Sequence, residues 1–95
     1  MNAGTAWRLR PGQALRHRQW DDEYVLYNDL SGDTHLLGGA AIEILLALAR
    51  GPATDAALAA LVEGEFDIDP ADAAAETGEL LALLQRLSLI TPDAC

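Results

Sequence analysis

Short runs of β-branched, aromatic and other apolar residues, separated by turn-forming residues, occupy positions 14 to 37 and are typical of β-strands. Tyr24 to Asn28 combines aromatic and β-branched residues, and Thr34 to Leu37 is a second extended run. Turn-forming residues between them, at positions 28 to 33, should reverse the chain. The earlier stretch Ala14 to Trp20 places Arg16 and Arg18 on one face and Leu15, His17 and Gln19 on the other, so it fits a strand that is at best half buried. The pattern predicts a meander of three antiparallel strands.

Three helices are predicted after these strands, where the apolar positions change from a period of two to one of about 3.6 residues. Gly51-Pro52 should end the first helix, because glycine caps a helix and proline cannot extend it. Thr54 is a suitable N-cap for the second, which Gly64 should end. The pair Asp69-Pro70 should open the third, as N-cap and first helical residue. The expected helices are 39–49, 55–63 and 70–87.

Two more short strands are expected near the ends of the chain. Thr5 to Arg10 alternates apolar and basic side chains, and Leu89-Ile90 follows the third helix. Between the second and third helices, Phe66 and Ile68 should fill gaps in the core.

Strands followed by helices define the expected fold class. The order predicts an α+β fold of the winged-helix kind, a small three-stranded antiparallel sheet followed by three helices. A chain of 95 residues holds one modest core, so we expect a single domain over residues 1–95. Residues 1–13 would hold the extra strand and residues 91–95 a tail.

The third predicted helix carries a buried stripe beside an acidic one. The buried positions should be those at a/d spacing, namely Ala73, Thr77, Leu80, Leu84 and Leu87, with Leu81 on a flank. The acidic stripe consists of Asp72, Glu76 and Glu79. Leu81 and Leu83 cannot both lie on the buried stripe, so at least one should be partly exposed. We therefore expect an apolar wall with an acidic rim.

Charge is distributed unevenly along the chain. The net charge is −9, and residues 51–95 contain nine acidic residues against one arginine. The predicted helices would repel phosphate backbones, which argues against nucleic acid as a partner. No apolar stretch reaches the length needed to cross about 30 Å of hydrocarbon, and the first residues lack the apolar core of a secretory signal. The sequence predicts a soluble, cytoplasmic protein with no membrane partner.

The residues that usually carry catalysis are scarce. His17, His35 and Cys95 are the only histidines and cysteine, and the chain has no glycine-rich phosphate loop. We therefore predict no catalytic residue, no metal ligand and no cofactor. His35 either forms a local hydrogen bond within its strand or contacts a bound peptide; Cys95 is expected to be an incidental thiol near the chain end.

Taken together, Trp20, the string YVLYNDLSGDTHLL and the following Ala-rich helix that closes at Gly51 resemble the PqqD-like family of small peptide chaperones, also called RiPP recognition elements. The GDTHLL part further resembles the branch whose genes accompany a kinase related to the HPr kinase. The resemblance covers about residues 14 to 90, and the sequence departs from the commoner pattern at Gly38, where that pattern has Asn.

The resemblance implies a non-catalytic peptide chaperone. Such a domain binds an extended leader or precursor peptide as an extra strand, in the cleft between the third strand and the third helix, and presents it to a modifying enzyme. Carried over to this chain, the peptide-binding residues would be Asp33, Thr34, His35, Leu36 and Leu37 on the strand and Ala73, Glu76, Thr77, Leu80, Leu83 and Leu84 on the helix. The partners would be that peptide and a modifying enzyme or HPr-kinase-related protein.

Two alternatives use the same fold. A homodimer could form if the exposed strand pairs with its own copy, as in a structural module. A winged-helix DNA-binding protein has the same order of elements, but no predicted helix carries the combination of Arg, Lys, Asn and Gln with which a recognition helix reads bases. The basic set Arg8, Arg10, Arg16 and Arg18 lies on predicted strands, where it either protects an edge from aggregation or contacts a partner enzyme.

Overall fold

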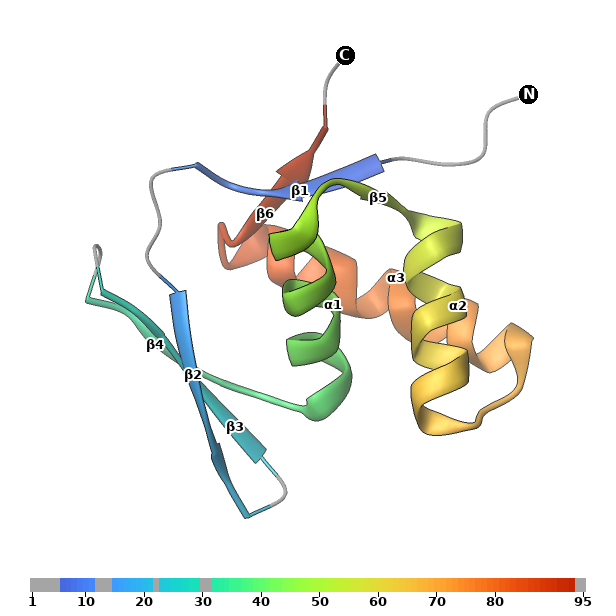
Figure 1. Ribbon diagram of the computed structural model, residues 1–95, viewed down its shortest axis with the longest axis horizontal. Helices are drawn as coiled ribbons and strands as arrows, with labels where there is room; N and C mark the ends of the chain where they lie inside the picture. The colour runs from blue at the N-terminus through green and yellow to red at the C-terminus, as the bar shows by residue number, and fades with distance from the viewer. Residues whose placement is uncertain (1–5, 12–14, 22, 30–31, 94–95) are drawn as a thin grey trace.

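The computed structural model describes residues 6–11, 15–21, 23–29 and 32–93. Thr5, Ala14, Ser31 and Cys95, which the sequence analysis places in strands, a turn and the tail, lie outside these residues. Figure 1 shows α1 standing between a small sheet and α2. The elements in chain order are β1 Ala6–Leu9, β2 Leu15–Trp20, β3 Glu23–Asn28, β4 Thr34–Leu37, α1 Gly39–Arg50, β5 Ala53–Thr54, α2 Asp55–Phe66, α3 Pro70–Arg86 and β6 Ile90–Pro92.

The predicted meander is confirmed. β2, β3 and β4 form an antiparallel sheet in that order, and His17, Leu26 and His35 lie opposite one another across it. Leu26 on the central strand is buried on the face toward α1, here called the inner face. Among the described residues this sheet is followed by three helices, which confirms the α+β class.

The N-terminal strand does not join the meander. β1 pairs instead with β5 and β6 in a second antiparallel sheet, with Trp7 opposite both Ala53 and Pro92. The indole N–H of Trp7 donates a hydrogen bond to the Asp55 carboxylate at the start of α2, and the Asp93 amide donates to the Ala6 carbonyl at 2.8 Å. This sheet therefore ties the first described residues to the last ones.

One hydrophobic core joins the inner face of the meander to all three helices. α1 crosses the centre, and its Ile44 is fully buried. Leu37 ends β4 in the same core, only 5% exposed. The buried cluster consists of Leu26, Leu37, Ala41, Ile42, Ile44, Leu45, Leu48, Leu58, Val62, Ala73, Leu81, Leu84, Leu89 and Ile90.

The end of α2 differs from the prediction. The helix continues through Gly64 and ends at Phe66, where Asp67 adopts a left-handed conformation with φ 52° and ψ 51°. One exposed glycine costs a helix only about 1 kcal/mol, which the burial of Leu58 and Val62 on the same helix offsets. The prediction that Gly64 ends the helix is wrong.

The prediction that Phe66 fills a gap in the core is wrong. Phe66 is 43% exposed, and its ring lies over Gly39 at the start of α1. Because α2 is one turn longer than predicted, Phe66 is carried past the core to its margin. Ile68 is half buried and packs against the core, as expected.

The helix starts follow the expected capping chemistry in part. The Thr54 side chain accepts a hydrogen bond from the Ala57 amide at 3.1 Å, which confirms it as the N-cap of α2. Gly38 precedes α1 and offers no side chain for a capping bond. Asp69 occupies the N-cap position of α3, but it is its carbonyl, not its side chain, that accepts from Ala73. Within the described residues, no helix is both long and apolar enough to cross a bilayer.

Truncation of Leu84 should show how much the shared core contributes to the stability of the domain. Leu84→Ala should lower the free energy of unfolding by about 2–5 kcal/mol, because a fully buried side chain is replaced by a cavity. Urea unfolding followed by circular dichroism measures this value. Gln85→Ala, at the exposed neighbouring position, should change it by less than about 0.5 kcal/mol. Equal effects of the two substitutions would contradict this placement of the core.

Candidate functional site

β4 is an open edge of the meander sheet. It pairs with β3 from Tyr27 opposite Thr34 to Tyr24 opposite Leu37, and no described strand pairs with its other side. In an antiparallel strand, alternate residues direct their N–H and C=O groups away from the paired neighbour. This side of β4 therefore offers backbone donors and acceptors to a further strand.

Side chains on β4 alternate between exposed and buried positions. Thr34 and Leu36 are exposed, and Leu36 is 61% exposed despite being apolar. His35 is half buried and Leu37 is buried on the inner face. Asp33 stands exposed just before the strand, and its carbonyl accepts a hydrogen bond from the Asn28 amide at 2.9 Å, which closes the turn.

α3 presents two adjacent stripes rather than one. The fully buried stripe consists of Ala73, Thr77, Leu81 and Leu84. Beside it, at helical spacing, is a second set, here called the flanking stripe, which consists of Glu76, Leu80 and Leu83 on α3 and Leu87 at its C-cap. Its three leucines are half buried against the core, and Glu76 is exposed.

Two sequence assignments on α3 change accordingly. Leu81 is 2% exposed and belongs to the buried stripe, so its assignment to a flank is wrong. It lies one turn after Thr77 and takes the inward position that the pattern gives to Leu80. Leu80 and Leu87 are only half buried. The expectation that Leu83 or Leu81 is partly exposed is confirmed by Leu83.

Burial divides the predicted peptide-binding residues into two groups. Leu37, Ala73 and Leu84 belong to the buried core, and Thr77 is 2% exposed, so these side chains are not accessible to a peptide. The accessible ones are Asp33, Thr34, His35, Leu36, Glu76, Leu80 and Leu83. Leu87, which sequence reasoning assigned to the core, extends the accessible helix surface. The spacing of positions 76, 80, 83 and 87 is the signal that identifies it.

The acidic rim of α3 carries unneutralised charge. The ion pairs formed among the described residues join Arg8 to Asp93 and Arg16 to Asp29, and neither involves α3. Asp72, Glu76 and Glu79 are all exposed. The surface beside the flanking stripe is therefore negative. In the part of the chain that the structure describes, no three His, Cys, Asp or Glu side chains gather as metal ligands would.

A family model covers most of this fold. Residues 23–90, from β3 to the start of β6, match the model of coenzyme PQQ synthesis protein D. The chain belongs to the PqqD family. No curated protein sequence gives a significant match to it.

Solved structures share the PqqD fold of this chain. A lasso peptide synthetase B1 complexed with the leader peptide is 27% identical, with a TM-score of 0.66 over 90% of this chain and 98% of that one. The PqqD truncation of Methylobacterium extorquens PqqCD, described as a stand-alone RiPP recognition element, is 26% identical, with a TM-score of 0.69 over 90% and 88%. TbiB1 in complex with the TbiA(beta) leader peptide, at 19% identity and a TM-score of 0.67 over 93% and 99%, shares the fold.

Thr77 allows a test of how a buried hydroxyl on α3 affects the stability of this PqqD-family domain. Its hydroxyl is buried and has no hydrogen-bond partner among the described residues. Thr77→Val, which keeps the shape and removes the hydroxyl, should raise the free energy of unfolding by about 1 kcal/mol. Thr77→Ser, which keeps the hydroxyl and removes a methyl group, should lower it. Thermal and urea unfolding measure both, and destabilisation by the valine would contradict the unpaired state of the hydroxyl.

Proposed function

We propose that this PqqD-family domain binds an extended leader or precursor peptide as an additional strand on β4. The observation that carries the proposal is the open β4 edge, which bears an exposed Leu36 on a strand anchored in the core by Leu37. Two of the structures that share this fold are named as complexes with a leader peptide, which supports the same occupant here.

The backbone and the side chains of the domain would contribute differently to recognition of the peptide. Hydrogen bonds from the β4 backbone supply affinity for any extended segment, and side chains at alternate positions supply selectivity. Apolar peptide side chains would pack on Leu36 or on the leucines of the flanking stripe. Because Glu76 belongs to that stripe and its charge is not neutralised, a Lys or Arg of the peptide should lie beside it.

We further propose that the domain presents the peptide and does not itself catalyse a reaction. Its partner would be the modifying enzyme, and the GDTHLL segment supports an HPr-kinase-related protein as that partner. Both would meet the domain in the cytoplasm. Self-association through β4 is the competing use of the same edge.

Mapping by NMR tests the site. Peptides encoded beside the gene, added to the labelled domain, should shift the backbone amides of Thr34 to Leu37 and of the flanking stripe. The same peptide N-methylated at alternate residues should bind at least about tenfold more weakly, because it lacks the donors for a ladder. Absence of shifts with every such peptide would contradict the proposal. Sedimentation separates the alternative, because a dimer that peptide leaves intact would indicate a structural module.

Charge reversal at Glu76 tests the chemistry of the peptide. Glu76→Lys should weaken binding of a basic and apolar peptide about three- to tenfold, because an attraction becomes a repulsion. Additional reversal of Glu79 should weaken it further. Glu65→Lys, which makes the same charge change at an exposed position of α2, should have little effect. Isothermal titration calorimetry measures the three affinities, and unchanged binding by the double variant would exclude a basic peptide.

A further inference from the structure

The meander sheet has a second open edge, at β2. This strand pairs with β3 from Leu15 opposite Asn28 to Trp20 opposite Glu23, and no described strand pairs with its other side. Its side chains alternate between the two faces of the sheet. Leu15 and His17 lie on the inner face with Leu26, whereas Arg16 and Arg18 lie on the outer face.

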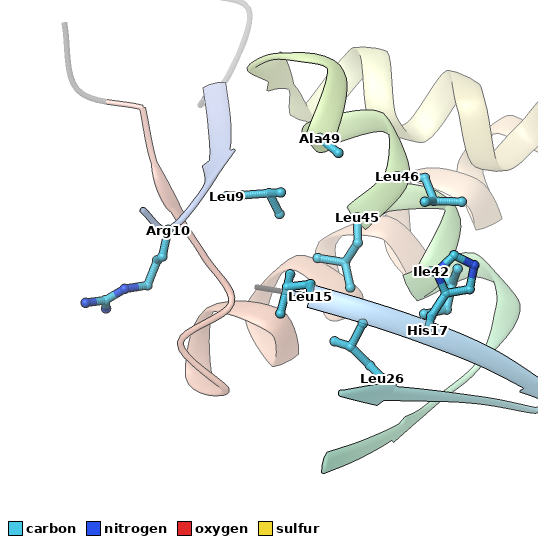
Figure 2. Close-up of a pocket in the computed structure, with 9 residues that line it drawn as sticks. All are labelled: Leu9, Arg10, Leu15, His17, Leu26, Ile42, Leu45, Leu46 and Ala49. Atoms are coloured by element: carbon cyan, nitrogen blue, oxygen red, sulfur yellow. The ribbon is translucent and has the colours of Figure 1, made fainter. Parts of the chain in front are cut away.

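An apolar pocket opens beside the inner side of β2. Its volume is about 200 Å³, and it lies between β2, the end of β1 and α1. Figure 2 shows Leu9 and Leu15 directed toward α1, while the Arg10 side chain points away. Leu46 on α1 is 39% exposed there. The lining residues are Leu9, Arg10, Leu15, His17, Leu26, Ile42, Leu45, Leu46 and Ala49.

The pocket is large enough to hold one apolar side chain of a bound segment. Small-molecule sites usually measure about 300–1,000 Å³, whereas a cavity of about 150 Å³ holds benzene. A pocket of about 200 Å³ therefore fits one leucine or phenylalanine side chain better than a cofactor.

The outer side of β2 is basic. A hollow beside β2 is lined by Arg16, Arg18 and Tyr27 of the outer face together with His17. Arg16 donates to both carboxylate oxygens of Asp29, at 2.7 and 3.3 Å, and lies 5.8 Å from the centre of the Tyr27 ring. Arg18 is exposed, and the ion pairs among the described residues do not include it. Its charge is therefore available to an acidic partner.

Protection against aggregation does not account for this arrangement. Charged side chains alone are enough to discourage pairing at an edge. An apolar pocket with a partly exposed Leu46 at the same edge has the opposite effect, because it favours an apolar occupant. The combination of basic outer side chains and an apolar inner pocket instead matches a strand whose residues alternate in character.

We propose that β2 binds, as an added strand, an acidic segment whose alternate residues are apolar. Its apolar side chains enter the pocket beside Leu46, and its Asp or Glu side chains lie next to Arg18. We assign this segment to the enzyme that modifies the bound peptide. This assignment rests on the proposed function, whereas the binding of an acidic strand to β2 does not. Because Arg18 gives β2 a positive charge that no ion pair among the described residues neutralises, this edge selects an acidic strand.

Titration with two synthetic peptides tests the proposal. A short peptide of alternating Glu and Leu should shift the backbone amides of residues 15–20 and 42–49 and leave those of 34–37 unchanged. A peptide of alternating Lys and Leu should not shift residues 15–20. Arg18→Glu should weaken the acidic peptide about fivefold, since opposite charges on paired strands become like charges. Arg86→Glu, the same change at an exposed residue of α3, should leave its affinity unchanged.

Three results of the peptide titrations would overturn the proposal. They are shifts at residues 34–37 instead of 15–20, equal binding of the two peptides, and unaltered binding by the Arg18 variant. A concentration-dependent dimer that the Arg18 variant abolishes would also overturn it, because a second copy would then occupy β2. Leader binding is read from residues 34–37 in the same spectra, so failure at β2 is distinguishable from failure of the proposed function.

Discussion

The packing of α1 against the inner face of the β2–β3–β4 sheet is the contact on which the rest of the molecule depends. A sheet of three short strands is stable only when a hydrophobic face is covered, and α1 supplies that cover through Ile42 and Leu45 against Leu26. α2 lies on the side of α1 away from this sheet, and residues of α2 and α3 complete the core. Nothing in this arrangement extends the sheet sideways among the described residues. The same contact that stabilises the strands therefore leaves both edges available.

Local patterns predicted the parts of the fold that local physics determines. The strand-forming residues of Tyr24 to Asn28 and Thr34 to Leu37, with turn formers between them, identify β3 and β4, and Thr54 caps α2 as its residue type requires. The open β4 edge also follows from the sequence, because the meander ends at that strand. The flanking stripe could be read from its spacing, but only burial separates it from the neighbouring stripe that includes Leu81.

Features that depend on distant partners could not be predicted in the same way. β1 has no local reason to pair with the two-residue β5 or with β6 rather than with the meander, since strand pairing depends on where the helices bring those segments. Gly64 is a sufficient stop signal only where packing does not favour a longer helix, and Leu58 and Val62 favour one here. The pocket at β2 combines residues from β1, β2, β3 and α1, so no single stretch of sequence contains it.

The pairing of β1 with β6 gives the domain one point of attachment. Ala6 and Asp93 are joined by a backbone hydrogen bond, so a chain fused before the first strand or after the last would leave from the same place. Neither β2 nor β4 contributes a residue to that sheet. A protein tethered at this junction would therefore leave the backbone of both meander edges unoccupied by its own point of attachment.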